Sequence, residues 1–333
     1  MVETTPGLVI RAGGDGSFSL WSEAFREGFH SGRGALREAR ETFLAPSQLE
    51  RFPPGTTLRV VEVCVGTGGN LALLLEACAA AGIALEWWGL ELDPRPLALA
   101  LTSETFRRAW QPQTLNLLER LRDNGNWRSE ASSGRLLQGD ARQTVAALLL
   151  EREGQMDLVW HDPFSPRRCP ELWTLECLGA TARLLAPSGR WISYCSAAAV
   201  RETLRRLGLQ LVALAIPDPT RDAPAPGGRP ERTTLWSGGT VASPTGLGVG
   251  PARHAFDRDG APRGGPLWRE LSAMERDHLA SAAGEPYRDP TGTADSATIL
   301  ATRLAAQAEA LDRGTRASSS AWRQRWGVGR GSG

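Results

Sequence analysis

The sequence predicts an α/β fold in which a doubly wound, mainly parallel sheet carries helices on both faces. Three observations lead to this prediction. Apolar runs of strand length alternate with segments of helical periodicity. The run at residues 58–65 is dominated by valine, which is typical of a central strand buried on both faces. A glycine-rich turn follows that run and leads directly into a helix.

Composition is that of an ordinary folded protein. The 333 residues are enough for one large domain with an appendage, or for two domains. A net charge of +1 gives no overall attraction to nucleic acid. The five cysteines form no C-x-x-C pair, so we expect reduced, mostly buried thiols. No secretion signal or membrane-length apolar run is found, which predicts a cytoplasmic protein with no membrane partner.

The segment before the first strand is expected to form an extension of the sheet domain. Residues 1–18 are turn-rich and predicted to be poorly ordered, whereas residues 36–44 have helical spacing that ends at Pro46. His30 and Ser31 belong to a His-Ser-Gly loop that could form part of the wall of a site. A structural role is the alternative, and it is the commoner one for a lone histidine.

The turn after the first strand has the shape of a nucleotide-type cofactor site. Gly66 and Gly68 allow the backbone to turn sharply and to approach a ligand closely. The spacing is not that of a dinucleotide fingerprint, because Leu71 stands where the third glycine is required. The pattern is E-x-x-x-G-x-G-x-N, starting at Glu62, and it is similar to the first motif of S-adenosylmethionine (SAM)-dependent methyltransferases. A tight structural connection is the alternative.

The helix behind this turn has recognisable ends. Asn70 is predicted to cap its start, and Gly82 to end it in the left-handed conformation that glycine tolerates.

A carboxylate ends the second strand, where a ribose would need it. Glu91 closes the apolar run that begins at Leu85, about 25 positions after the glycine turn, and its two oxygens can accept both ribose hydroxyls. Asp93, just before Pro94, is interpreted as the cap of the next helix.

A second acidic residue follows the third strand. Asp140 and Ala141 open a predicted helix over residues 141–152, and the carboxylate can accept the exocyclic amine of an adenine. A plain helix cap is the alternative. We favour adenine because two cofactor motifs precede it in order.

The fourth strand, residues 156–161, ends in a stiff loop that presents an acid. Asp162 is followed by Pro163, Phe164 and two further prolines. The carboxyl end of this strand lies at the crevice where open sheets bind ligands. The segment is similar to the Asp/Asn-Pro-Pro-aromatic loop of methyltransferases that act on amino groups. There a carboxylate can hold the N–H groups, receive a proton and direct the nitrogen lone pair, while Phe164 can stack on a planar base. The alternative is a helix entry with Asp162 as its cap.

The rest of the chain continues the alternation and then becomes irregular. We expect a helix over 171–185, a strand over 190–196, a helix to residue 207, a strand over 209–215 and a last, antiparallel strand over 233–237. Residues 216–268 are rich in proline and glycine. Helices are predicted over 269–280 and 295–311. The terminal WRQRW could contact phosphate and stack on bases, or belong to a solvated terminus.

Read in order, these segments resemble the methyltransferase domain of the MnmC family. The resemblance spans residues 18–237 and is carried by HSGRGALREARETFL, VEVCVGTGGN, LELDP, GDAR, DLVWHDPFSPRRCPELWT and LLAPSGRWISYCSAAAVRETLRRLGL. It implies the class I SAM-dependent methyltransferase fold, which is Rossmann-like. It also implies N-methylation of the aminomethyl group on the wobble uridine of tRNA, giving 5-methylaminomethyl(-2-thio)uridine.

The resemblance also implies roles for individual residues. Asp162 would orient the amine. The residues implied to contact SAM are Glu62, Gly66, Thr67, Gly68, Asn70, Glu91, Asp140 and Ala141. Those implied to shape the target pocket are His30, Ser31, Phe164, Pro166, Arg168 and Trp173. Three positions depart from the family pattern: Cys64 and Pro163 replace glycines, and Cys169 replaces an asparagine.

The resemblance suggests three parts: an N-terminal extension at 1–54, the methyltransferase domain at 55–240, and a low-complexity and helical tail at 241–333. Many relatives carry an FAD-dependent oxidase domain as well. No second glycine fingerprint follows residue 237, so we expect a stand-alone transferase, with a separate enzyme supplying the aminomethyl uridine. No metal is expected.

With a charge so near neutrality, tRNA binding would require arginines gathered on one face. The candidates are Arg33, Arg37, Arg167, Arg168 and Arg205. Two other functions stay open at this point. One is a methyltransferase or aminopropyltransferase for a small-molecule or protein amine, and the other is a non-catalytic RNA-binding protein.

Overall fold

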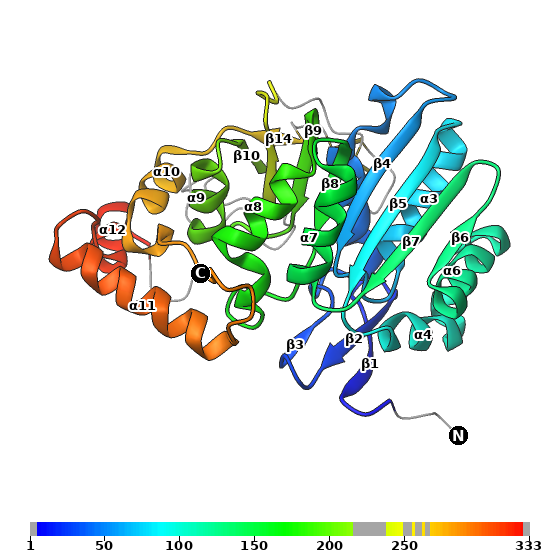
Figure 1. Cartoon of the computed structure of the whole chain (residues 1–333), viewed down its shortest axis with the longest axis horizontal. Coiled ribbons are helices and arrows are strands. Elements are labelled where there is room, and N and C mark those ends of the chain that lie inside the picture. The colour runs from blue at the N-terminus through cyan, green and yellow to red at the C-terminus, as the bar shows by residue number, and fades with distance from the viewer. Residues whose placement is uncertain (1–4, 216–237, 249–254, 257–261, 264–266, 329–333) are drawn as a thin grey trace.

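A nine-stranded sheet forms the centre of the molecule (Figure 1). The computed structural model describes residues 5–215, 238–248, 255–256, 262–263 and 267–328. The strands of the sheet are β4 (Thr57–Val63), β5 (Ala84–Glu91), β6 (Asn126–Arg128), β7 (Ser132–Gln138), β8 (Met156–His161), β9 (Leu185–Ser193), β10 (Gln210–Leu214), β11 (Gly239–Ser243) and β14 (Trp268–Arg269). Their order across the sheet is β14-β10-β11-β9-β8-β4-β5-β7-β6.

The middle of the sheet is parallel. Successive strands are added on one side of β4 as far as β6, and on its other side from β8 onward, so the strand order reverses at β4. β4 pairs in parallel with β5 on one side and with β8 on the other, and β7 and β9 extend the parallel set outward. β11 runs antiparallel to both β9 and β10. The predicted doubly wound sheet with an antiparallel late strand is therefore confirmed. The segment 233–237, where that strand was expected, lies outside the described residues.

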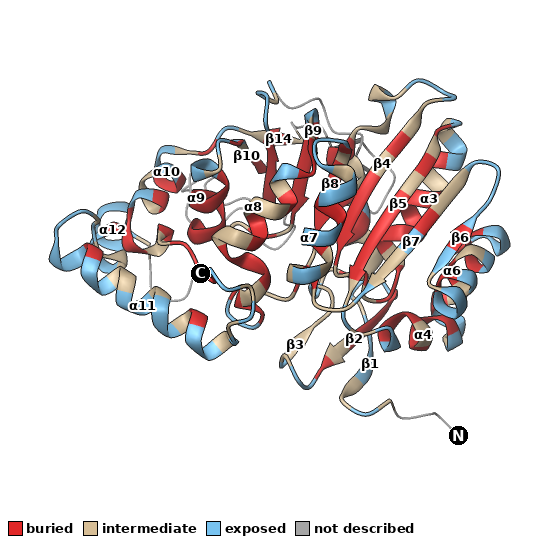
Figure 2. Ribbon diagram, in the orientation of Figure 1, coloured by how far each residue is buried: buried red, intermediate tan, exposed pale blue. Residues whose placement is uncertain are grey.

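Helices cover both faces of the sheet. Those that follow the first three parallel strands are α3 (Gly69–Ala81), α4 (Arg95–Thr102), α5 (Glu104–Arg107), α6 (Pro112–Asn124) and α7 (Ala141–Arg152). Those that follow the fourth and fifth are η3 (Pro170–Trp173), α8 (Leu175–Arg183) and α9 (Ala198–Arg206). Figure 2 shows the buried residues concentrated in the strands and on the helix faces turned toward them.

Adjacent residues of the central strands enter opposite layers of the core, because side chains alternate across a strand. Val60 and Trp87 belong to the cluster that includes α3, α4 and α6, whereas Val61 and Trp88 belong to the cluster beneath α7, α8 and α9. This double burial explains why apolar residues occur on both faces of these strands.

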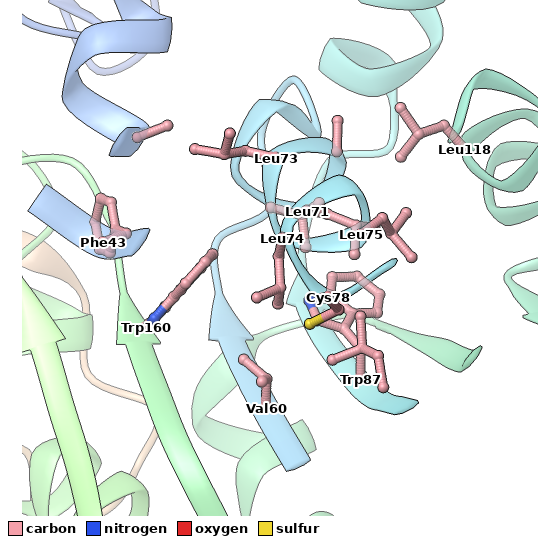
Figure 3. Close-up of a cluster of buried hydrophobic side chains, with 14 of the residues drawn as sticks. Phe43, Val60, Leu71, Leu73, Leu74, Leu75, Cys78, Trp87, Leu118 and Trp160 are labelled. Carbon is pink, nitrogen blue, oxygen red and sulfur yellow. The ribbon is translucent and has the colours of Figure 1, made fainter. Parts of the chain in front are cut away.

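Figure 3 shows the first of these layers, in which Leu74 and Cys78 of α3 pack over Val60 and Trp87 of the sheet. α3 ends at Gly82, whose φ of 64° is the predicted left-handed C-cap.

A small N-terminal sheet precedes the main one. It comprises β1 (Leu8–Ala12), β2 (Phe18–Ser22) and β3 (Glu27–Gly28), paired antiparallel in that order. The prediction that residues 1–18 are poorly ordered is wrong for the described part, which begins at residue 5. β1 is a short strand flanked by glycines, and its order depends on pairing with β2 further along the chain, which local sequence does not reveal. Figure 1 shows β1–β3 beyond the end of the main strands.

The predicted helix over residues 36–44 is confirmed and has an irregular middle. It consists of α1 (Ala35–Glu38), the π-helical η1 (Ala39–Leu44) and α2 (Ala45–Ser47), and it is followed by the 3₁₀ turn η2 (Leu49–Arg51). The wider π turn begins directly after Glu38. Phe43 is fully buried in the core layer of α3.

The C-terminal segment packs against the sheet domain. α10 (Ala273–Ala280) and α11 (Ser296–Asp312) confirm the two predicted helices, and α12 (Ser319–Trp326) contains the WRQRW sequence. Trp322 is 2% exposed and stacks on His278, while Arg325 and Trp326 contact Asp277. These contacts hold α12 to α10, although Trp322 is the one buried residue of WRQRW and the other four are exposed. Residues 329–333 lie outside the described residues. The described remainder of this region contains η5 (Ala282–Gly284), β12 (Ala255–Phe256) and β13 (Pro262–Arg263).

A buried ion pair joins α9 to α10. Arg201 and Glu275 are 1% and 2% exposed and lie 3.0 Å apart, and Arg201 also donates to Thr240 Oγ1 at 2.8 Å. Removing one partner of such a pair leaves a buried charge uncompensated. We expect Glu275→Ala to lower the free energy of unfolding by about 3–5 kcal/mol. Urea denaturation measures this, with the exposed Glu270→Ala as the control. A loss for Glu275→Ala no larger than that of the control would contradict the prediction.

Within the described residues, no helix combines the length and the apolar composition that crossing a bilayer requires.

Candidate active site

A cavity of about 600 Å³ lies at the carboxyl ends of β4, β5 and β8. Its walls include the glycine turn after β4, the segment from Glu91 to Pro96 after β5, and Asp162 to Phe164 after β8. The small N-terminal sheet and its loops form the opposite wall. The cavity therefore lies where the strand order reverses, the usual ligand crevice of an open α/β sheet.

The glycine turn forms one wall of this cavity. Gly66 has a φ of 55° and Gly68 a φ of 78°, conformations that favour glycine. A Cβ on Gly68 would lie 2.8 Å from Leu97 Cδ1, so α4 also requires a glycine there. Thr67 lines the cavity and is buried. Gly68 lies just behind the wall as the N-cap residue of α3.

Asn70 does not cap α3, which corrects the prediction. The helix begins at Gly69 after a Gly68 N-cap that has no side-chain hydrogen bond. Asn70 is thus already inside the first turn, and its amide reaches across the cavity wall to donate from Nδ2 to Asp162 Oδ2 at 3.0 Å. The residue therefore links the loop after β4 to the loop after β8.

Glu91 lies on the cavity wall at the end of β5. Its Oε2 accepts from the Gly66 N–H at 2.9 Å and its Oε1 from the Asp93 N–H at 2.9 Å. Burial raises its pKa, and these backbone donors oppose the rise. Asp93 is not the N-cap of α4, which corrects the prediction: the N-cap is Pro94, without a side-chain cap hydrogen bond. Asp93 lies one residue earlier and accepts from the Arg95 N–H at 3.0 Å.

Three further predicted cofactor residues, Glu62, Asp140 and Ala141, lie outside the cavity wall. Glu62 is fully buried inside β4, where its Oε2 accepts from Trp87 Nε1 at 3.0 Å, and burial raises its pKa to about 8. Asp140 caps α7 by accepting from the Arg142 N–H at 2.9 Å, and it also binds the Arg142 guanidinium at 2.7 Å. Ala141 follows it as the first residue of α7. For Asp140 the structure therefore displays the helix-cap geometry.

The loop after β8 is braced on several sides. Tyr194 donates its hydroxyl to Pro163 O at 2.7 Å, and Trp173 Nε1 donates to Phe164 O at 2.8 Å. Glu27 Oε2 accepts from the Ser165 N–H and hydroxyl, at 3.1 and 2.8 Å. Asp162 thus stands on a loop whose backbone is fixed from both the main sheet and the N-terminal sheet. Burial raises the pKa of Asp162, and the charge of Glu38 adds to the rise.

The predicted pocket residues are only partly brought together. His30, Ser31 and Phe164 line the cavity, and Phe164 stacks on Phe25 at a ring-centroid distance of 4.5 Å. Trp173 is fully buried behind the loop, so it supports Phe164 from outside the cavity. The remaining two, Pro166 and Arg168, lie further along the loop and do not line the cavity.

Several wall residues were not identified from the sequence. Glu27, Glu38 and Tyr194 line the cavity, and so do Phe25 and Phe29. Phe29 meets Phe164 edge-to-face at a ring-centroid distance of 5.1 Å. Most of these come from the N-terminal segment, whose sequence carries aromatic and acidic residues but no spacing that marks a ligand site.

Cys64, which stands where the family resemblance implies glycine, also lines the cavity. Its φ of 67° lies in the left-handed region, which side chains other than glycine adopt at a cost of about 1–3 kcal/mol. The conformation explains why a glycine suits this position.

The suggested arginine docking surface is wrong as a set. Arg33 and Arg37 are both paired with Glu41, and Arg205 is paired with Glu202. Each of these three arginines is therefore already engaged by a carboxylate of the protein itself. The other two members, Arg167 and Arg168, are exposed on the loop after β8 and have no ion pair within the described part of the chain.

Comparison with known proteins gives consistent relationships. A family model described as S-adenosyl-L-methionine-dependent methyltransferase matches residues 104–214. The tRNA 5-methylaminomethyl-2-thiouridine biosynthesis bifunctional protein MnmC of Chromobacterium violaceum is 30% identical over 267 residues, which cover 76% of this chain and 37% of that protein. An uncharacterized protein of Methanocaldococcus jannaschii is 28% identical over 197 residues, covering 57% of this chain and 51% of that protein. The chain therefore spans only part of the length of these relatives.

The chain is similar to the crystal structure of MNMC2 from Aquifex aeolicus, with a TM-score of 0.70 and 27% identity. The match covers 92% of this chain and 86% of that one. It therefore includes most of the fold outside the sheet as well as the sheet itself.

Proposed function

Since this chain is a SAM-dependent methyltransferase of MnmC type with the class I fold, we propose that it methylates the aminomethyl group on the wobble uridine of tRNA. The product would be 5-methylaminomethyl(-2-thio)uridine. The observation that carries the proposal is that Glu91 and Asp162, which come from different strands, line one cavity. A residue suited to a ribose and a residue suited to an amine then face the same space.

The walls of the cavity are chemically suited to SAM. The glycine turn offers close backbone approach, and the carboxylates of Glu38, Glu91 and Asp162, which have no ion pair among the described residues, suit a cationic donor. We propose that Glu91 accepts the ribose hydroxyls, and that Gly66, Thr67 and Asn70 line the rest of the donor site. When bound, SAM would supply a methyl group activated by its sulfonium. The adenine contact of Asp140 stays a proposal, since its carboxylate is already engaged by Arg142.

Asp162 is proposed to act on the acceptor amine. An alkylamine is mostly protonated at neutral pH, and only the deprotonated nitrogen has a lone pair for attack. The Asp162 carboxylate can accept a proton from the nitrogen and then hold a remaining N–H, while Asn70 Nδ2 fixes the carboxylate at 3.0 Å. Phe164 is proposed to stack on the uracil ring, and its own ring stacks on Phe25.

The proposed domain limits, 1–54, 55–240 and 241–333, stay a prediction that limited proteolysis can test. β11 (Gly239–Ser243) and β14 (Trp268–Arg269) both belong to the main sheet, so the sheet continues beyond residue 240.

The decisive experiment supplies tRNA that carries the unmethylated aminomethyl nucleoside. After incubation with the protein and SAM, the tRNA is digested and its nucleosides are analysed by mass spectrometry. The aminomethyl nucleoside should gain one methyl group. Putrescine and a lysine-rich protein serve as competing amines in parallel reactions. Methylation of either of these with none of the tRNA would replace our proposal with a small-molecule or protein methyltransferase.

The brace on the loop yields a separate prediction. Tyr194→Phe removes the hydroxyl that holds Pro163 O, so Asp162 should be less well positioned. We expect kcat to fall roughly 10-fold, because small displacements of a catalytic group are costly, with little change in donor affinity. Steady-state kinetics at saturating SAM measures the first quantity and calorimetry the second. Tyr287→Phe, away from the cavity, is the matched control. Equal kcat values for the two variants would show that the brace is not needed.

A further inference from the structure

The cavity wall is strongly acidic. Its described lining residues include the carboxylates of Glu27, Glu38, Glu91, Asp93 and Asp162. The guanidinium that lines it, that of Arg95, is bound to Asp93 at 2.7 Å. His30 adds no fixed positive charge, because burial lowers its pKa. Among the described residues, the other four of these carboxylates, those of Glu27, Glu38, Glu91 and Asp162, have no ion pair.

Glu38 has no ion pair among the described residues, and its charge acts on His30, where it opposes the larger effect of burial that lowers the histidine pKa. The residue is 9% exposed and lines the same cavity as Asp162. Its Oε2 accepts from the Ser31 N–H at 3.0 Å, and within the described residues no hydrogen bond or ion pair reaches its Oε1. A largely buried carboxylate without a cation is costly, so its place in the wall indicates a cationic ligand.

Arginines in the same region of the chain do form ion pairs with a carboxylate. Glu41 lies one turn further along the same helix and binds both Arg33 and Arg37. Glu38 is instead the last residue before the π-helical η1. Single π turns inside helices are frequent at functional sites. Glu38 and Asp162 are close enough for the charge of the first to raise the pKa of the second, after the larger effect of burial.

We propose that Glu38 is a second acceptor-binding carboxylate, which together with Asp162 binds the incoming amine as an ammonium. The inference rests on the proposed transfer to an amine and specifies the charge state in which the substrate is recognised. Each carboxylate accepts one N–H of the ammonium. One proton would then pass to Asp162, which leaves the nitrogen with the lone pair that forms the new N–C bond, while the C–S bond between the methyl group and the sulfonium of SAM breaks and S-adenosylhomocysteine leaves. Glu38 keeps its hydrogen bond to the amine during this step.

Binding of two donor analogues tests the proposal without any tRNA. Sinefungin carries an amine where SAM carries its methyl group, so its ammonium would point at the acceptor carboxylates. S-adenosylhomocysteine has a neutral thioether at this position. The wild-type protein should bind sinefungin more tightly. Glu38→Gln keeps the acceptor for Ser31 and removes the charge, so it should weaken sinefungin roughly 10- to 100-fold and leave S-adenosylhomocysteine unchanged.

Isothermal titration calorimetry gives both affinities. Glu41→Gln, on the same helix but paired with arginines, is the matched control and should behave as wild type. Glu38→Asp keeps the charge and should retain most of the preference, which guards against a loss that reflects folding alone. An unchanged sinefungin preference in Glu38→Gln would overturn the proposal. Equal weakening of both ligands would overturn it too, because Glu38 would then only support the fold through Ser31.

The result is independent of the acceptor. A wild-type protein that shows the charge-dependent preference but does not methylate tRNA would refute the tRNA assignment and leave Glu38 as an amine-binding residue. If the protein methylates tRNA and Glu38→Gln has no effect on sinefungin binding, the tRNA assignment stands and the role of Glu38 in amine binding is refuted.

Discussion

Asp162→Asn should nearly abolish methyl transfer while leaving donor binding intact. The amide has the size of the carboxylate and can keep a hydrogen bond to Asn70, so the loop should hold its position. It cannot accept a proton from the acceptor nitrogen. Loss of a general base costs about 10²- to 10⁴-fold in rate. We expect kcat to fall within that range and the Kd of S-adenosylhomocysteine to change by no more than about threefold.

The matched control is Asp157→Asn, at the opposite end of the same strand. Asp157 accepts from the Arg59 N–H at 2.8 Å and does not line the cavity. Single-turnover rates with aminomethyl tRNA and saturating SAM make the comparison direct. If Asp162→Asn keeps more than a tenth of the wild-type rate, Asp162 is not the base.

Asp162→Asn should also change how the rate of methyl transfer depends on pH. Asp162 acts as a base only when it is ionised, so the rate should rise with pH as its carboxyl loses a proton. Burial first, and the Glu38 charge next, raise the pKa of this carboxyl, so the rise should lie above the usual range of an aspartate. In Asp162→Asn this limb should be absent, and only the titration of the acceptor amine should remain. An identical profile in both proteins would count against the assignment.

Glu91→Ala should remove donor binding. Two roles are lost together: the carboxylate proposed to hold the ribose hydroxyls, and the acceptor that ties the Gly66 N–H to the end of β5. Each hydrogen bond to a charged group contributes about 1.5–3 kcal/mol, which is roughly 10- to 100-fold in affinity. We therefore expect S-adenosylhomocysteine to bind at least about 100-fold more weakly by calorimetry.

Glu91→Gln should weaken binding less, by about tenfold, because the amide oxygen can still accept one hydrogen bond. Glu86→Gln is the matched control, since Glu86 lies on the same strand but is paired with Arg59 at 3.1 Å. Donor affinity in Glu91→Ala within twofold of wild type would exclude the ribose role.

Local patterns allowed the sheet and the two principal carboxylates to be predicted. Valine-rich runs, the glycine turn and helix-forming segments are properties of neighbouring residues, so Glu91 and Asp162 could be placed at strand ends by reading along the chain. Because parallel strands in such a sheet present their carboxyl ends at one edge, their meeting in a common cavity also followed from the pattern.

Hydrogen-bond partners were harder to predict from the sequence than the strands and the two carboxylates. Asn70 fits the pattern of a helix cap, yet its amide is used by Asp162, which is 92 positions away in the chain. Asp140 fits either a cap or an adenine contact, and only the folded chain shows that Arg142 engages it. The arginines proposed to bind tRNA also depend on the folded chain, because three of them form ion pairs with Glu41 or Glu202.

The sequence by itself therefore determined the type of sheet, the edge that holds the site and the acids that two of its strands present there. The tertiary structure alone decided how that edge is enclosed: Glu27 and Glu38 arrive from the N-terminal segment, and Tyr194 from the segment after β9. The physical reason is that a strand or helix is encoded by residues adjacent in the chain. A closed, charged wall is formed by side chains that become neighbours only after the long-range pairings of the fold are made.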